Sequence, residues 1–195
     1  MKLRHDATLR IIGGEWRSRR VAFDPACDLR PTPDRVRETL FNWLAPYIQG
    51  ATCIDAFAGS GALGLEALSR GAAHVTFVER DARQVAMLQR AITLLGADAR
   101  ARIIHGDALA VLRSGAPCRL VFLDPPYAAD ALQTALAAAV PRLTPANRVY
   151  LEWPQNRPQT LPPGYALLKT GGAGRVSYGL ATYRLAPAGW QEEQA

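Results

Sequence analysis

The sequence predicts an α/β fold around a mostly parallel sheet, with an antiparallel C-terminal hairpin and a small hairpin-and-helix extension at the N-terminus. From residue 51 onward, short apolar runs alternate with amphipathic segments, as strands and helices do in a parallel sheet. Residues 55–64 place glycines where the first strand turns into a helix. The apolar run 120–123 reads as a buried strand and stops at Asp124-Pro125-Pro126-Tyr127.

The composition favours one domain and excludes several classes of protein. The chain has 195 residues, enough for a domain with a small appendage. No apolar run reaches the ~18 residues of a membrane span, and the N-terminus lacks the apolar stretch of a secretory signal, so we expect a cytoplasmic protein. Its cysteines (Cys27, Cys53, Cys118) are scattered, as free thiols are in a reducing compartment. The three histidines are scattered too, and no metal site is predicted.

The charge indicates a polyanionic partner. The net charge is +6 and the isoelectric point about 9.6. All 23 basic residues except Lys2 and Lys169 are arginines, whose planar fork binds two phosphate oxygens. The candidates for contact with nucleic acid cluster near the N-terminus and are Arg17, Arg19, Arg20, Arg30, Arg35 and Arg37.

The N-terminal segment is predicted to be a hairpin followed by a helix. Strands at 9–12 and 20–23 flank a loop in which Trp16 stands among arginines; this loop is either a solvated surface or a contact with phosphates and a stacked base. Thr32 is the expected N-cap of the helix, Pro33 fits its first position, and Asp34 complements the helix dipole.

The remaining elements follow in order. Strands are expected at 51–57, 74–79, 101–105, 118–123 and 147–153, with helices at 62–70, 81–95, 107–114 and 129–142. Two further strands, at 165–170 and 176–185, are split by glycines in 171–174 and form the closing hairpin. We therefore expect a basic arm at 1–32, a main domain at 33–186 and a flexible tail at 187–195.

The glycine loop is compatible with two different cofactors. Gly59, Gly61 and Gly64 match the dinucleotide pattern G-x-G-x-x-G, and Glu79 ends the second strand where a carboxylate would receive ribose hydroxyls. A nicotinamide-dependent dehydrogenase is thus one candidate. Asp55 argues against it, because a carboxylate at this point would repel a pyrophosphate but attract the sulfonium and ammonium of S-adenosylmethionine.

Acidic residues end four successive strands. Asp55, Glu79, Asp107 and Asp124 each lie at the carboxyl end of one of the predicted strands, and these ends form the ligand crevice of an open sheet. Asp107 could accept from an adenine amino group, although each acid alone could equally be a helix cap or a surface charge. The two prolines after Asp124 lack N–H groups and stiffen the turn. The carboxylate, the free carbonyls and the Tyr127 ring together suit a planar ligand with an exocyclic –NH2. The alternative interpretation is that this stretch is only a polar loop after a strand.

With these motifs, the chain resembles a class I S-adenosylmethionine-dependent methyltransferase, with a Rossmann-like sheet. More closely, it is similar to the bacterial family of D-type small-subunit methyltransferases, which methylate guanine N2 in 16S ribosomal RNA. The matching stretches are Ile11-Ile-Gly-Gly-Glu-Trp-Arg17, residues 29–44 (LRPTPDRVRETLFNWL), residues 55–66 (DAFAGSGALGLE), Val78-Glu-Arg80 and Asp124-Pro-Pro-Tyr127. Ser18 departs from the family, whose arms often have glycine there.

The resemblance implies a role for each motif. Asp55, Phe57, Gly59 and Gly61 would hold the methionine part of the cofactor, Glu79 its ribose, Arg80 the flank of its adenine, and Asp107 and Ala108 the adenine edge. Asp124, Pro125, Pro126 and Tyr127 would hold the target base. The implied partner is 16S rRNA or the small ribosomal subunit, and nothing in the sequence demands more than a monomer. The alternatives are a DNA adenine-N6 or cytosine-N4 methyltransferase, the NAD(P)-dependent oxidoreductase, and a catalytically dead RNA-binding assembly factor.

Overall fold

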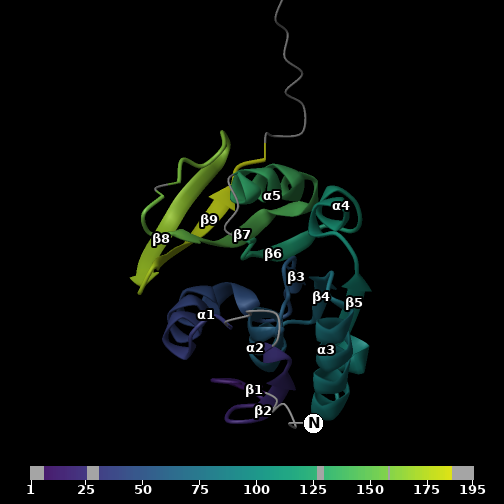
Figure 1. Ribbon diagram of the computed structural model, residues 1–195. Helices are drawn as coiled ribbons and strands as arrows, with labels where there is room; N and C mark the ends of the chain where they lie inside the picture. Colours follow the sequence, from purple (N-terminus) through teal and green to yellow (C-terminus); the bar gives the residue numbers. More distant parts are fainter. Residues whose placement is uncertain (1–6, 26–30, 127–129, 158, 186–195) are drawn as a thin grey trace, which may run out of the picture.

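The computed structural model describes residues 7–25, 31–126, 130–157 and 159–185, and it has the predicted α/β architecture (Figure 1). Its centre is a seven-stranded sheet in the order β5-β4-β3-β6-β7-β9-β8. The strands are β3 (Thr52–Asp55), β4 (His74–Glu79), β5 (Ala101–His105), β6 (Cys118–Leu123), β7 (Leu143–Pro154), β8 (Tyr165–Ala173) and β9 (Val176–Tyr183). Strands β3 to β7 pair in parallel, and β9 is antiparallel to β7 and β8, which confirms the C-terminal hairpin.

Helices cover both faces of the sheet (Figure 1). On one face lie α1 (Asp34–Ile48), α2 (Ala62–Ser69) and α3 (Ala82–Leu95); on the other lie α4 (Ala108–Arg113) and α5 (Ala131–Ala139). Two 3-10 turns, η2 (Asp98–Arg100) and η3 (Val140–Arg142), follow α3 and α5. Because both faces are buried, the central strands are nearly continuous apolar runs, and the sequence pattern located them well. Within the described residues, no helix has the length and apolarity to span a bilayer.

The N-terminal hairpin packs against the sheet domain. It pairs β1 (Ala7–Arg10) with β2 (Arg20–Phe23) in antiparallel register. Leu9, Val21 and Phe23 are buried in the same apolar cluster as α1 and α2, so hairpin and sheet share one hydrophobic core. The connecting loop includes Ser18 at φ +68°, in the left-handed region that favours glycine.

A buried carboxylate fastens this hairpin to α2. Glu66 is fully buried and accepts hydrogen bonds from the backbone N–H groups of Ile12 and Gly13, both at 2.9 Å. Arg37, also fully buried, lies 3.4 Å from the carboxylate, and Arg70 donates to it at 2.7 Å. We call Glu66, Arg37, Arg70 and the two backbone donors the arm clamp.

Two local expectations were wrong. Pro33 rather than Thr32 is the N-cap of α1, and the Thr32 hydroxyl instead donates to Glu152 at 3.1 Å. Strand β8 continues through Gly171 to Ala173, and the chain turns at Gly174, where φ is +60°. A Cβ on Gly171 would lie 2.5 Å from the Tyr178 ring, so this glycine permits a close cross-strand contact and is not a turn residue.

Candidate active site

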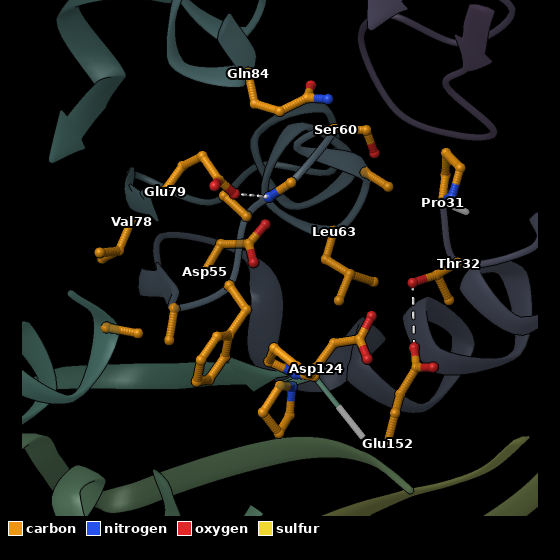
Figure 2. A pocket seen from close by; sticks show the side chains of 18 of the residues that line it. Pro31, Thr32, Asp55, Ser60, Leu63, Val78, Glu79, Gln84, Asp124 and Glu152 are labelled. Carbon is orange, nitrogen blue, oxygen red and sulfur yellow. Dashed lines mark hydrogen bonds between the residues drawn. The ribbon is translucent and has the colours of Figure 1, made fainter. Parts of the chain in front are cut away.

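A cavity of about 1210 Å³ opens at the carboxyl ends of β3, β4, β5 and β6 (Figure 2). The chain order of the strands reverses there, because β3 lies between β4 and β6, and ligands of open α/β sheets bind at such a point. The predicted site residues that line the cavity are Asp55, Phe57, Gly59, Glu79, Arg80, Asp107, Ala108, Asp124, Pro125 and Pro126. Gly61 does not line it, and Tyr127 lies outside the described residues.

The glycine loop is held tightly between β3 and α2. Gly59 and Gly61 have φ of +50° and +76°, which few other residues tolerate. A Cβ on Gly61 would lie 2.5 Å from Leu88 of α3, and one on Gly64 would lie 2.1 Å from the Phe77 ring of β4. Gly59 therefore faces the cavity, while Gly61 and Gly64 allow the loop and α2 to approach their neighbours.

Asp55 is an almost fully buried acid at the bottom of the loop. Its carboxylate accepts one hydrogen bond, from the Gly64 N–H at 2.9 Å. Burial raises the pKa of Asp55 to about 7, and the nearby charge of Glu79 adds to this rise. Among the described residues, no cation pairs with Asp55, and a buried carboxylate of this kind favours a ligand that brings positive charge.

Glu79 and Asp107 have structural partners in addition to their place in the cavity. Glu79 accepts from the Gly59 N–H at 2.7 Å and from the N–H groups of Arg80 and Asp81, both at 2.8 Å. Asp107 is the N-cap of α4 and accepts from the Ala110 N–H at 2.8 Å. These backbone donors fix the orientation of both carboxylates before a ligand binds, and a bound ligand would share the carboxylates with them.

Asp124 directly follows β6 and lines the cavity on the side away from the glycine loop (Figure 2). Burial raises its pKa well above the usual range, and repulsion from Glu152 and from Asp55 adds to the rise. Among the described residues, no side chain or backbone group donates a hydrogen bond to this carboxylate. Pro125 is buried and Pro126 exposed, and both line the cavity. The turn thus presents an unpaired acid beside carbonyls that have no competing N–H.

Sequence reasoning missed Glu152, a second acid at this end of the cavity (Figure 2). It lies on β7, it is only 5% exposed, and its carboxylate accepts from the Tyr150 hydroxyl at 2.7 Å as well as from Thr32. The sequence feature that could have identified Glu152 is its position as a charged residue inside the apolar run 149–153. Burial raises its pKa, although the two hydroxyl donors oppose that rise.

The predicted nucleic-acid contacts divide into exposed and buried residues. Arg17, Arg19, Arg20 and Arg35 are exposed, and Arg19 donates to the Leu94 carbonyl at 2.7 Å. The prediction for Arg37 was wrong, because its guanidinium is fully buried in the arm clamp. Trp16 is also buried, at 3% exposure, and cannot stack on a base in this conformation. Arg30 lies outside the described residues.

The donor set of the cavity fits S-adenosylmethionine better than a dinucleotide. Six carboxylates line it, and Asp55, the most buried of them, lies beside the glycine loop, where a pyrophosphate would bring negative charge. A sulfonium and an ammonium would instead relieve the burial of Asp55. In the described part of the chain, no group of three or more His, Cys, Asp or Glu side chains is placed to hold a metal ion.

Comparisons with known proteins extend over hairpin and sheet alike. Residues 9–182 match the protein family described as Conserved hypothetical protein 95. The chain is 43% identical over 176 residues to the ribosomal RNA small subunit methyltransferase D of Escherichia coli K12, covering 88% of each chain. It is 40% identical over 178 residues to the same-named protein of Haemophilus influenzae, covering 88% of this chain and 92% of that one. The solved structure of the Escherichia coli protein yhhF matches with a TM-score of 0.83 and 40% identity, covering 91% of this chain and 99% of that one.

Proposed function

The chain belongs to the family described as Conserved hypothetical protein 95 and, with it, to the ribosomal RNA small subunit methyltransferases D, and from this membership we propose that it methylates the N2 amine of a guanine in 16S ribosomal RNA. It is a methyltransferase that uses S-adenosylmethionine. The observation that carries the proposed reaction is the unpaired carboxylate of Asp124, which shares one cavity with the glycine loop.

The proposed cofactor site is the part of the cavity nearest the glycine loop. When bound there, S-adenosylmethionine supplies an electrophilic methyl group on its sulfonium. Asp55 and Gly59 would hold the methionine end, and Phe57 would pack beside it. Glu79 would accept from the ribose hydroxyls, while Asp107 and Ala108 would meet the adenine edge and Arg80 its flank. Gly61 contributes indirectly, through the shape of the loop.

The proposed catalytic step rests on Asp124 and Pro125. An exocyclic amine is a poor nucleophile, because its lone pair is delocalised into the ring. The Asp124 carboxylate and the Pro125 carbonyl would each accept one N–H of the amine, which turns the lone pair toward the methyl carbon. Transfer forms an N–C bond and breaks the C–S bond, and Asp124 or water takes the surplus proton. Orientation of two reactants in this way can remove roughly 7–11 kcal/mol from a barrier.

The alternatives fit the site less well. A nicotinamide cofactor would place its pyrophosphate among the acids of the cavity. A DNA amino-methyltransferase needs a region that reads sequence, whereas the described residues add only the hairpin and α1 to the sheet domain. A dead assembly factor would have no need of the closely packed glycine loop and the unpaired Asp124. A target base in an RNA loop also needs little energy to enter the site, since it is already unstacked from its neighbours.

The deciding experiment is transfer of labelled methyl from S-adenosylmethionine to three acceptors: unmodified small ribosomal subunits, naked 16S rRNA and unmethylated DNA. We expect label in one or both RNA samples, recovered as N2-methylguanine after nucleoside digestion. Label in DNA alone would replace the proposal with the DNA enzyme. Binding of NAD(P) without binding of S-adenosylmethionine would replace it with the oxidoreductase.

We also propose that the exposed arginines of the hairpin bind RNA phosphates, with the protein acting as a cytoplasmic monomer. Combined replacement of Arg17 and Arg20 by Ala should weaken binding to all RNA sequences and reduce the slope of log affinity against log salt by about one for each arginine that contacts a phosphate. Glu38→Ala, an exposed change on α1, is the control and should leave the slope unchanged. An unaltered slope in the double variant would remove the hairpin from the RNA interface.

A further inference from the structure

Glu152 stands beside Asp124 at the same edge of the sheet. Strands β6 and β7 pair in parallel with Leu123 opposite Leu151, so Asp124 and Glu152 are each the next residue beyond this pair. Both line the cavity, and Figure 2 shows their carboxylates close together, on the side away from the glycine loop. Repulsion from Glu152 raises the pKa of Asp124 more than repulsion from Asp55 does, which agrees with this proximity.

Two buried hydroxyls fix how the Glu152 carboxylate lies. The Tyr150 hydroxyl, at 2.7 Å, and the Thr32 hydroxyl, at 3.1 Å, both donate to the same oxygen, Oε1. Among the described residues, nothing donates to Oε2. A carboxylate that keeps two donors on one oxygen is held in one orientation and has its second oxygen available for a ligand.

The Watson–Crick edge of guanine fits two neighbouring acceptors. Guanine presents N1–H next to its N2 amine, so two donors lie side by side. Adenine and cytosine place a ring nitrogen with a lone pair next to their amine, and a carboxylate there would face that lone pair. Enzymes that extract a base read it by hydrogen bonds on this edge.

On the basis of the proposed function, we propose that Glu152 Oε2 accepts the N1–H of the target guanine beside the amine held by Asp124, and that Thr32 and Tyr150 are positioning residues for it. The site is then specific for guanine because its second acceptor has no partner on adenine or cytosine. Thr32 affects base recognition indirectly, through its hydrogen bond to Glu152, and makes no contact with the base itself.

The test compares guanine with 2-aminopurine at the methylated position. 2-Aminopurine keeps the N2 amine but has a lone pair instead of a hydrogen at N1. Ligated 16S rRNA carrying either base is presented in the assembly state that the wild-type protein accepts, and kcat/KM is measured for each. Glu152→Gln should lower kcat/KM on guanine by about 10- to 100-fold and lower the guanine-to-2-aminopurine ratio by at least about tenfold. The amide can turn its NH2 toward the lone pair, which explains the change of preference.

The controls separate specificity from folding. Affinity for S-adenosylmethionine should stay within about twofold in Glu152→Gln. Thr32→Val should lower the guanine-to-2-aminopurine ratio of kcat/KM, and Thr32→Ser, which keeps the hydroxyl, should restore it. These two variants test the inference even if Glu152→Gln does not fold. Equal losses on both bases would reduce Glu152 to a structural role and overturn the inference, as would weakened cofactor binding. A wild-type protein that labels no guanine would instead overturn the proposed function.

Discussion

Two groups of carboxylates differ in how their charge is balanced. In the arm clamp, Glu66 has two arginines and two backbone N–H donors around it. In the cavity, Asp55 has one backbone donor, Asp124 has none among the described residues, and Glu152 has two neutral hydroxyls. A balanced buried charge holds a fold together, whereas an unbalanced one raises the free energy of the empty site until a ligand supplies the missing donors and cations.

The largest expected effect tests the balanced group. Glu66→Ala would leave Arg37 buried without its main counter-charge and free two backbone donors, so we expect the free energy of unfolding to fall by about 3–5 kcal/mol. Urea denaturation measures it, with Glu38→Ala as an exposed control. A denaturation midpoint equal to that of the wild-type protein would show that the clamp adds nothing to stability.

The second prediction concerns the unbalanced group. Asp124→Asn replaces an acceptor with an amide that can turn a donor toward the target amine, and we expect kcat for rRNA methylation to fall by about 100- to 1,000-fold. Because the folded protein raises the pKa of Asp124, its ionised form costs folding free energy at neutral pH, and the variant should be as stable as the wild type or more so. Lower stability, or weak cofactor binding, would contradict the role of Asp124.

A third, smaller effect is the pH dependence of cofactor binding. With a pKa of about 7, Asp55 is protonated in the free protein at lower pH, and a bound ammonium would require its ionised form. Affinity for S-adenosylmethionine should then fall by up to about tenfold for each pH unit below 7 and level off above it. By the same linkage, the free protein loses stability as the pH rises from the ordinary aspartate value toward 7.

Calorimetric titrations between pH 5.5 and 7.5 measure this slope. Asp55→Asn keeps an acceptor for the Gly64 N–H but has no proton to release, so its binding should be weaker and independent of pH over this range. A wild-type affinity that does not change with pH would mean that no cation binds beside Asp55.

The smallest effect lies in the loop that the clamp fastens. Ser18 is held at φ +68°, a conformation that costs a residue with a Cβ about 1 kcal/mol relative to glycine. Ser18→Gly should relieve this strain and raise the free energy of unfolding by roughly 0.5–1 kcal/mol. The gain does not exceed the strain itself, because glycine also gives the unfolded chain more conformational entropy. Thermal unfolding beside the wild type detects it, and a destabilised variant would show that the Ser18 conformation is not strained.

The sequence predicted those parts of the fold that depend on local pattern. The strands β4, β5 and β6 were located at their observed bounds, because each contains a short apolar run that ends at a polar or turn residue. The acids after those strands were found for the same reason. Glu152 was missed because its meaning depends on the register between β6 and β7, which no local pattern contains.

The wrong predictions were those that long-range partners decide. Arg37 looks like any other arginine near a helix start, and distant partners, the buried Glu66 29 residues away and the Arg10 carbonyl, help to withdraw it from the surface. Thr32 has the residue type and the position of a helix cap, but a carboxylate from β7 competes for its hydroxyl. In both cases the local preference was sound and a tertiary contact overrode it.

The bond between Thr32 and Glu152 also bears on the order in which a newly made chain matures. The two residues are 120 positions apart, so Thr32 leaves the ribosome long before its acceptor has been synthesised. A nascent chain that has emerged only through β6 already carries the glycine loop and Asp124, yet it lacks both Glu152 and the strand that supports it. The cofactor half of the cavity can thus assemble during synthesis, while the half that faces the base waits for β7.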